Sequence, residues 1–356
     1  NSIFNNTFKR IYRIMKHVVM MRLSAMGDVA MTVPIISALV SQYPEVKVTV
    51  VSRPFFKPFF NHIPNVEFFA VDLNNRHKGF LGLYRLYTDL KKLKVDYFAD
   101  FHNVLRSKIV RTFFALSGTK VAFTDKGRDE KKALTRTEKK VFAPVKSMVN
   151  RHLETLQKLG FNVSLQNPIF PTKPILNEDI ISKVGNKNDK WIGIAPFAQY
   201  DSKVYPKDLM EEVIRILSEN QNYRIFLFGG GNKEIELLDQ MQQQIDNVFV
   251  LAGKLSFKEE LIVIQNLDVM LSMDSGNAHI AAMYGIPVVS LWGQTHPFAG
   301  FVPFNQPDEN SITADRNQYP LIPTSIYGNK MVPGYENAMR TILPEMVVNQ
   351  INKIVK

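Results

Sequence analysis

The fold is decided by residues 269–293, VMLSMDSGNAHIAAMYGIPVVSLWG. The apolar run Val269–Met273 predicts a buried strand of a parallel sheet. The Asp-Ser-Gly turn at 274–276 then opens a helix, which ends at Gly-Ile-Pro before a second strand at Val288–Leu291. A helix that begins at the carboxyl end of a parallel strand offers unpaired N–H groups to an anion, typically a phosphate. The stretch therefore predicts an α/β domain with an anion site, although a capped helix in any α/β domain has the same pattern.

The order of strand, turn and helix recurs along the chain. Strands are expected at 17–23, 46–51, 66–71, 95–99 and 120–123, and again at 191–195, 223–228, 247–251, 269–273 and 288–291. Between the two sets, residues 161–175 are irregular and rich in proline, which is typical of a linker. This alternation predicts two doubly wound α/β halves with parallel sheets, and an active site in the cleft between them.

These patterns divide the chain into five expected parts. They are an N-terminal extension or tag at 1–14, a first Rossmann-like domain at 15–165, a linker at 166–188, a second Rossmann-like domain at 189–334, and a C-terminal helix at 335–356. Residues 1–14 mix basic and apolar side chains, so a short amphipathic helix on an anionic membrane is an alternative for them.

Composition narrows the class of protein. No apolar run reaches the roughly 18 residues that a membrane-spanning helix needs, and no secretory leader is visible. The chain has no cysteine, which excludes disulfides and thiolate metal sites and fits a reducing, cytoplasmic compartment. Its formal net charge of +11 indicates an anionic partner: nucleic acid, a membrane surface or an acidic substrate.

Polar side chains at strand ends are the candidate functional groups. Asp28 follows the first expected strand and a glycine turn, where a carboxylate can act as a general base or simply cap the next helix. Lys203 lies in a strand-to-helix loop, and three glycines at 229–231 let a ligand approach the backbone. Asp100 and His102, at another strand end, are secondary candidates, for which a structural role is the simpler interpretation.

Residues 124–147 form a basic segment with few apolar side chains. Its basic residues are Lys126, Arg128, Lys131, Lys132, Arg136, Lys139, Lys140 and Lys146. Such a segment is either a solvated loop or a binding loop for a small polyanionic acceptor. Few aromatic residues lie between the charges, which disfavours a groove for single-stranded nucleic acid.

Four motifs, taken in order, resemble the ADP-heptose:lipopolysaccharide heptosyltransferases, glycosyltransferase family 9. They are RLSAMGD at 22–28, KVYP at 203–206, GGG at 229–231 and DSGNAH at 274–279. The resemblance covers the chain from Met15 to Lys356. It implies a GT-B fold, in which two Rossmann-like domains face a central cleft and the C-terminal helix packs back toward the N-terminal domain. It also implies inverting, metal-independent transfer of a heptose or related sugar from an ADP-sugar to a lipopolysaccharide core or other lipid-linked acceptor.

The same resemblance implies roles for individual residues. Asp28 would be the general base that takes the proton of the acceptor hydroxyl. The donor would be bound in the C-terminal domain by Lys203, Gly230, Glu234, Asp274, Ser275, Gly276, Asn277 and His279. The acceptor would be bound by Arg22, Ser24, Gly27, Arg128, Lys131, Lys132 and Arg136. Many family members hold the donor ribose with a glutamate after the glycine turn, a role that either Asn232 or Glu234 would take here.

The resemblance implies a cytoplasmic enzyme without a cofactor that can associate peripherally with the inner membrane. Two other interpretations stay open. A GT-B-fold sugar-nucleotide epimerase would act on a nucleotide sugar without a lipid acceptor. A non-enzymatic protein would bind an anionic ligand, and its binding to nucleic acid would weaken with salt.

Overall fold

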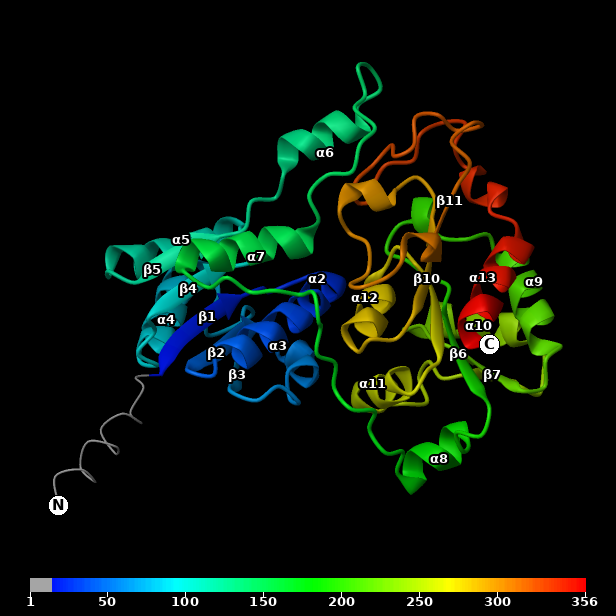
Figure 1. The fold of residues 1–356 in the computed structure, drawn as a ribbon, viewed down its shortest axis with the longest axis horizontal. Helices are drawn as coiled ribbons and strands as arrows, with labels where there is room; N and C mark the ends of the chain where they lie inside the picture. The colour runs from blue at the N-terminus through cyan, green and yellow to red at the C-terminus, as the bar shows by residue number, and fades with distance from the viewer. Residues whose placement is uncertain (1–14) are drawn as a thin grey trace. The chain divides into compact units, whose positions relative to one another are not determined.

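The computed structural model describes residues 15–356 and contains two α/β units (Figure 1). The first unit consists of residues 15–126 together with Val149–Ile169. The second consists of Gly127–Met148 and Phe170–Lys356. The expectations for residues 1–14 lie outside the described residues.

The first unit is built on a parallel sheet of five strands. These are β1 (Lys16–Met21), β2 (Val46–Ser52), β3 (Val66–Ala70), β4 (Tyr97–Asp100) and β5 (Lys120–Phe123). Their order across the sheet is β3-β2-β1-β4-β5, so β1 lies in the centre with β2 and β4 at its sides. This is the doubly wound arrangement that the sequence predicted, and ligands bind to such sheets at the carboxyl ends of the strands.

Helices connect these strands and cover the sheet. They are α2 (Met26–Ala30), α3 (Thr32–Gln42), α4 (Gly79–Lys91), α5 (Leu105–Leu116) and α7 (Met148–Leu159), with a 3₁₀ helix η1 at Pro54–Phe59. Leu86 of α4 and Phe114 of α5 are fully buried in one cluster with Phe98 of β4. Burying such side chains contributes about 1.5–3 kcal/mol each, which fixes these helices to the sheet.

The second unit has a parallel sheet of six strands. They are β6 (Lys190–Ala195), β7 (Tyr223–Leu227), β8 (Val248–Val250), β9 (Val269–Met273), β10 (Val288–Trp292) and β11 (Ser311–Thr313), in the order β11-β10-β9-β6-β7-β8. Every residue of β9 is buried, which explains its continuous apolar sequence. Strand β11 was not predicted, because three residues are too few for a recognisable period.

The helices of the second unit alternate with its strands as expected, except that the first two precede β6. They are α6 (Arg128–Thr135), α8 (Glu178–Val184), α9 (Lys207–Ser218), α10 (Asn232–Gln242), α11 (Phe257–Gln265), α12 (Gly276–Met283) and α13 (Pro344–Val355). Short 3₁₀ helices are η2 (Asp201–Lys203), η3 (Pro297–Ala299), η4 (Asp308–Asn310) and η5 (Ala338–Thr341). Helix α12 begins directly after β9, as the opening stretch of sequence predicted.

The basic segment groups differently from the sequence-based division. The sequence pattern places residues 124–147 in the N-terminal domain, whereas the structure groups Gly127–Met148 with the second unit. Backbone N–H groups at the end of the segment donate to the 3₁₀ region around η3: Val145 to Phe298 O and Met148 to Gly300 O, both at 2.9 Å. In the sequence, the segment lies between β5 and α7, which both belong to the first unit. Its place in the chain therefore gave no sign of these contacts with the second unit.

Helix α13 contributes to the core of the second unit. Its buried residues Val347, Val348, Ile351 and Val355 belong to one cluster with residues of β9 and α9. The amphipathic sequence of this helix predicts that one face is buried, but not which core buries it.

Candidate functional site

Asp28 lies in the first turn of α2, a few residues beyond the carboxyl end of β1. Its Oδ2 accepts a hydrogen bond from the Ala25 N–H at 3.2 Å and lies 2.5 Å from Nη2 of Arg22. The Asp28 side chain is nevertheless 23% exposed. Asp28 therefore helps to cap its own helix while part of its side chain stays exposed, and the two roles considered from the sequence are compatible.

Arg22 is held by three groups of the first unit. Besides Asp28, its guanidinium donates from Nε to Ser24 O and from Nη1 to Phe101 O, each at 2.8 Å. Its side chain is only 9% exposed. Three fixed contacts hold the fork of the guanidinium in one orientation. Of the residues predicted to bind the acceptor, Arg22 thus contacts Asp28 and the Ser24 carbonyl, and Gly27 is buried within α2.

His102 lies close to this ion pair as a neutral group. Its Nδ1 accepts a hydrogen bond from the Leu23 N–H at 3.4 Å. Burial, together with the positive charges of Arg22 and Lys126, lowers the pKa of His102 to about 3. A histidine with this pKa carries no charge near pH 7, and its proton acceptor at Nδ1 is already in use.

The contacts of the Asp100 carboxylate indicate a structural role. Its Oδ1 accepts hydrogen bonds from the N–H groups of His102 and Asn103, and its Oδ2 lies 3.0 Å from Nη1 of Arg111. Burial raises the pKa of Asp100 above its ordinary value, although these hydrogen bonds and Arg111 act in the opposite direction. The carboxylate is fully buried and closes the turn after β4.

The second unit places Lys203 beside Asp274. Nζ of Lys203 lies 3.0 Å from Oδ2 of Asp274, and the two side chains are 13% and 9% exposed. Lys203 ends η2 after strand β6, and Asp274 follows β9, which pairs with β6. Residues far apart in the sequence therefore meet at the carboxyl edge of the sheet, as expected for a ligand site of this fold.

Two glycines that the sequence analysis did not select adjoin this ion pair. A Cβ at Gly293 would lie 2.6 Å from the Ser202 carbonyl oxygen, and one at Gly328 would overlap the Lys203 side chain. Both positions let backbone approach η2 closely. Gly293 comes two residues after the predicted strand at 288–291, and this position could have identified it.

The amino terminus of α12 lies next to Asp274. Ser275 is the N-cap residue, but its side chain makes no capping hydrogen bond, and its Oγ lies 3.0 Å from Oγ of Ser272. The first turn of α12, with Gly276 and Asn277, is therefore not capped by Ser275. Such N–H groups, together with the helix dipole, favour an anion. His279 is buried one turn further along the helix.

The glycine turn after β7 uses Glu234 internally. The Gly230 N–H donates to Oε2 of Glu234 at 2.8 Å, and Asn232 is the first residue of α10. One carboxylate oxygen of Glu234 thus stabilises the turn itself.

The basic residues of α6 and the residues after it have two kinds of environment. Arg128, Lys132 and Arg136 are exposed. Lys131 is buried, with Nζ 4.3 Å from the centre of the Phe301 ring. A cation over an aromatic face is stabilised by the ring, so this burial favours a structural role for Lys131.

Thr295 is a further candidate that the sequence analysis missed. It lies in the loop after β10, is fully buried, and its Oγ1 has no hydrogen-bond partner among the described residues. Buried hydroxyl groups normally have a hydrogen-bond partner. The Thr295 hydroxyl therefore indicates a position where a ligand could donate or accept a hydrogen bond. Its signal in the sequence is the polar Gly-Gln-Thr run directly after a buried strand.

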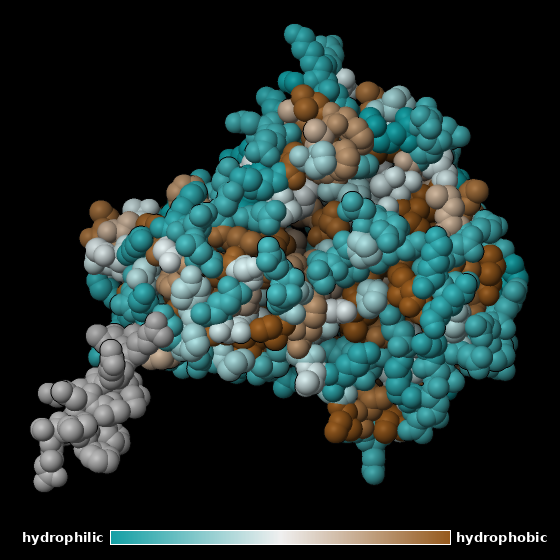
Figure 2. Space-filling model, in the orientation of Figure 1, coloured by the Kyte–Doolittle hydropathy of each residue, from teal (hydrophilic) through white to brown (hydrophobic). Residues whose placement is uncertain are grey.

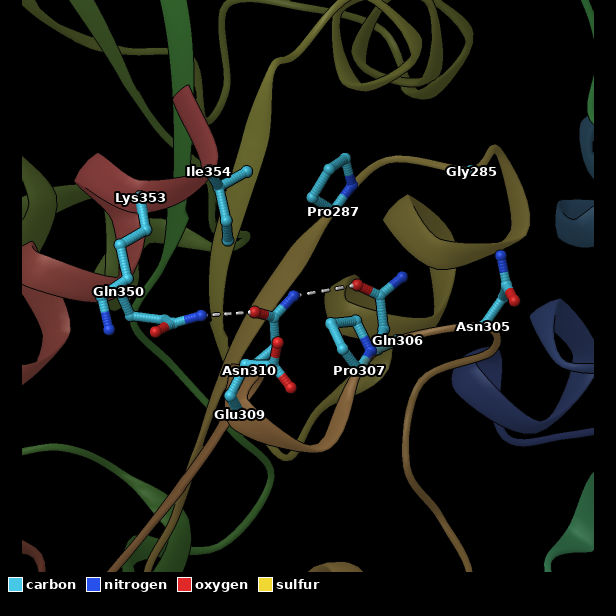
Figure 3. A pocket seen from close by; sticks show the side chains of 10 residues that line it. All are labelled: Gly285, Pro287, Asn305, Gln306, Pro307, Glu309, Asn310, Gln350, Lys353 and Ile354. Carbon is cyan, nitrogen blue, oxygen red and sulfur yellow. Dashed lines mark hydrogen bonds between the residues drawn. The ribbon is translucent and has the colours of Figure 1, made fainter. Parts of the chain in front are cut away.

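A separate cavity of the second unit holds none of the predicted site residues. It measures about 590 Å³ and lies between α13 and the loop from β10 to β11 (Figure 3). Its amide side chains bond to one another, from Gln350 Nε2 to Asn310 Oδ1 at 2.7 Å and from Asn310 Nδ2 to Gln306 Oε1 at 3.4 Å. These hydrogen bonds connect α13 to the loop, so the amide side chains have a structural role here.

In the described part of the chain, the potential metal ligands do not cluster into a metal site. Within residues 15–356, no group of three or more His, Cys, Asp or Glu side chains is arranged to hold a metal ion.

The chain is similar in sequence to known heptosyltransferases. Two relatives are "Lipopolysaccharide heptosyltransferase 3" of Escherichia coli, 24% identical over 76% of this chain and 81% of the relative, and "Lipopolysaccharide core heptosyltransferase OpsX" of Haemophilus influenzae, 23% identical over 95% and 97%. Among solved structures, E. coli heptosyltransferase WaaC with ADP has a TM-score of 0.67 at 18% identity, covering 95% of this chain and 99% of that one.

These likenesses agree with the architecture described above. The structural likeness shows the fold, which is GT-B. The family model "Glycosyltransferase family 9 (heptosyltransferase)" matches residues 83–325, which is more than half of the chain. The motifs around Lys203 and Asp274 lie within that match. The chain is therefore a glycosyltransferase and belongs to glycosyltransferase family 9.

Proposed function

We propose that this protein transfers a heptose from an ADP-heptose donor to a lipopolysaccharide core acceptor, with inversion at the anomeric carbon and with Asp28 as the general base. The names of the relatives, which are lipopolysaccharide heptosyltransferases, support this donor and acceptor class. The order of the four sequence motifs supports the roles of the residues.

The Lys203–Asp274 pair at the amino terminus of α12 carries the proposal. Departure of ADP places growing negative charge on a diphosphate, which needs fixed positive groups nearby. Lys203 supplies an ammonium held in place by Asp274 at 3.0 Å, and the first turn of α12 supplies N–H groups that Ser275 leaves uncapped. Gly276, Asn277 and His279 would line the same pocket, and Gly230 would lie along the nucleotide.

Asp28 suits the role of base in an inverting displacement. The acceptor oxygen would attack the anomeric carbon and lose its proton to the Asp28 carboxylate. The bond from that carbon to the diphosphate oxygen would break, and its electron pair would leave with ADP. A direct displacement needs one base and no second carboxylate. Arg22 and the Ala25 N–H bind the Oδ2 atom of Asp28 and hold the carboxylate in place for this proton transfer.

The leaving group would be stabilised without a metal ion. In this proposal the ammonium of Lys203 and the dipole of α12 take the role that a divalent cation has in other glycosyl transfers. Addition of EDTA should then leave the rate unchanged.

The basic residues Arg128, Lys132 and Arg136 are the proposed contacts of the anionic acceptor. All three are exposed, so they can meet a large ligand. A lipid-linked acceptor also places the enzyme at the membrane surface. We propose that this association is peripheral. Within the described part of the chain, no helix has the length and apolar character to cross a bilayer.

Product analysis tests the proposal. The protein is incubated with ADP-heptose and a lipopolysaccharide core acceptor that lacks the heptose, and the products are examined by mass spectrometry and NMR. We expect ADP and a heptosylated acceptor with inverted anomeric configuration. Retention of configuration would exclude the single displacement.

The same experiment separates the alternatives. An epimerase would convert the nucleotide sugar to an isomer without any acceptor. A non-enzymatic binding protein would release no ADP, and its binding to DNA would fall steeply with salt. A thermal-shift series with ADP, UDP, GDP and CMP identifies the nucleotide, because a ligand stabilises the folded state that binds it.

A further inference from the structure

Helices α4 and α5 of the first unit expose large apolar side chains. On the face of the molecule in Figure 2, hydrophilic residues predominate and hydrophobic ones form separate patches. Against that background, Phe80 and Leu81 of α4 are 64% and 70% exposed, Tyr84 is 49% exposed, and Leu105 at the start of α5 is 75% exposed. We call these four residues the α4–α5 apolar surface. Single exposed apolar residues are common, but a group of this size usually marks an interaction site.

Phe80, Tyr84 and Leu105 adjoin one another, and Leu81 precedes Tyr84 by three positions on α4, which puts both on the same side of that helix. Phe80 and Tyr84 both pack against the Phe113 ring of α5, with ring centres 6.0 and 5.3 Å apart. The first turns of the two helices also share a shallow cavity of about 530 Å³, which Phe80 and Leu105 both line. The aromatic rings of α4 and the leucine of α5 therefore adjoin the same depression.

Basic side chains surround this surface. Lys78 and Arg106 line the cavity, and Arg85 and Lys108 are exposed on the same two helices. No carboxylate in the described part of the chain forms an ion pair with any of these four. Helix α5 contains no acidic residue, and the single acidic residue of α4, Asp89, is bound by Arg76 at 2.7 Å. The positive charge around the apolar residues is thus not balanced locally.

We propose that the α4–α5 apolar surface docks on an anionic lipid bilayer. Phe, Tyr and Leu side chains insert to the level of the headgroups, while Lys and Arg beside them bind lipid phosphates. Charge complementarity selects this occupant, because each basic residue near an anionic membrane adds attraction, whereas a second copy of this surface would repel the first. The inference deepens the proposed function, on which it rests for the lipid-linked acceptor, but the binding itself can be measured without any transfer.

Vesicle binding tests the proposal. The full chain is sedimented with vesicles of phosphatidylcholine alone and of phosphatidylcholine mixed with phosphatidylglycerol. We expect binding to the mixed vesicles that weakens with salt, and little binding to the neutral ones. The double variant Leu81→Gln/Leu105→Gln should lower the partition coefficient about 10-fold or more, because two apolar insertions are lost. The double variant Arg106→Ser/Lys108→Ser should reduce the part of vesicle binding that depends on salt concentration.

Matched controls identify the surface. Ile175→Gln, at a position 94% exposed in the second unit, changes the same chemistry elsewhere and should bind like the wild type. Lys9→Ser/Arg10→Ser/Arg13→Ser tests the N-terminal residues in the same way. The proposal is overturned if Leu81→Gln/Leu105→Gln binds vesicles as the wild type does, if only the N-terminal variant loses binding, or if no anionic vesicle is bound. It is also overturned if the leucine variant instead changes the molecular mass in solution, which would indicate a protein contact.

Failure of the proposed function is recognised separately. Transfer to a water-soluble core oligosaccharide should be unchanged in Leu81→Gln/Leu105→Gln, whereas transfer to an acceptor embedded in mixed vesicles should fall. A wild-type chain that binds vesicles through this surface but transfers no sugar to either acceptor would refute the proposed reaction and leave the docking surface standing.

Discussion

Arg22 Nη2 lies 2.5 Å from Asp28 Oδ2, and the same guanidinium donates to the carbonyl groups of Ser24 and Phe101. An arginine that is fixed to backbone on two sides can hold a carboxylate in one orientation, so the ion pair determines where the Asp28 oxygens point. If Asp28 is the general base, its activity therefore depends on Arg22 as a positioning residue.

Asp28→Asn should abolish most of the activity. The amide oxygen can still accept from the Ala25 N–H, so the turn should persist, but an amide cannot take a proton from the acceptor. We expect kcat to fall about 10²–10⁴-fold, as for loss of a general base, with the affinity for ADP unchanged. Steady-state kinetics and calorimetry with ADP provide the two measurements. Activity near the wild-type level would exclude Asp28 as the base.

Arg22→Lys should lower kcat while leaving KM for the donor unchanged. Lysine keeps the positive charge but cannot donate in three fixed directions, so Asp28 would lose its orientation. A misplacement of this kind costs about 10- to 100-fold in rate. Arg215→Lys, at an exposed position of α9, is the matched control. An increase in KM for the acceptor with unchanged kcat would instead assign Arg22 to acceptor binding.

Lys203→Met should weaken both donor binding and folding. The affinity for ADP should fall about 10-fold or more, or about 1.4 kcal/mol per factor of ten. Removing one partner of a nearly buried pair leaves Asp274 uncompensated, which should destabilise the unit by up to about 3 kcal/mol. The double variant Lys203→Met/Asp274→Asn separates the two effects, since stability should recover while ADP affinity should not. Recovery of ADP affinity in the double variant would contradict a direct role for Lys203.

Lys131 and Lys132 offer a comparison between neighbours. Both were predicted from the sequence to bind the acceptor, but Lys132 is exposed, whereas Lys131 is buried over the Phe301 ring. Lys132→Met should raise KM for the acceptor a few-fold without a change in Tm, because an exposed charge contributes little to stability. Lys131→Met should instead loosen the attachment of Gly127–Met148, measured as faster hydrogen exchange there. Equal effects on KM would show that both lysines bind the acceptor.

The fold was predictable because its parallel strands are buried on both faces. The apolar runs at 191–195 and 269–273 stand out in the sequence and correspond to strands β6 and β9. Strand β11 and the grouping of Gly127–Met148 were not predictable in this way. They depend on contacts between distant segments, such as the hydrogen bond from Val145 N–H to Phe298 O, that leave no periodic signal.

The candidate site was predictable where a polar residue follows a strand. Asp28, Lys203 and Asp274 were selected on this basis. The ion pair between Lys203 and Asp274 lies at the carboxyl edge of the second sheet. Thr295 and Gly293 occupy a comparable place after β10 but were missed, because a threonine or glycine after a strand is too common to stand out. The partners that position each group, such as the two carbonyl acceptors of Arg22, come only from the three-dimensional structure.

His296 should make the second unit sensitive to mild acid. The ring is buried between Phe142 and Phe298, and its Nδ1 accepts from the Phe298 N–H at 3.1 Å. Burial, and then the charges of Arg316 and Lys140, lower the pKa of His296 to about 4.

Proton binding at His296 makes the folded state less stable as the pH falls. Between pH 6.5 and about 4 the unfolded chain binds a proton at His296 that the folded chain excludes. Stability is therefore complete above pH 6.5 and is lost as the pH falls, by up to about 2 kcal/mol at pH 5. Asparagine can still accept from the Phe298 N–H but does not titrate, so His296→Asn should reduce the difference in unfolding free energy between pH 7 and pH 5. His102, with a pKa of about 3, adds a similar contribution in the first unit, which the variant leaves in place. Urea unfolding of both proteins at the two pH values measures the difference, and an identical loss in wild type and variant would show that His296 does not cause it.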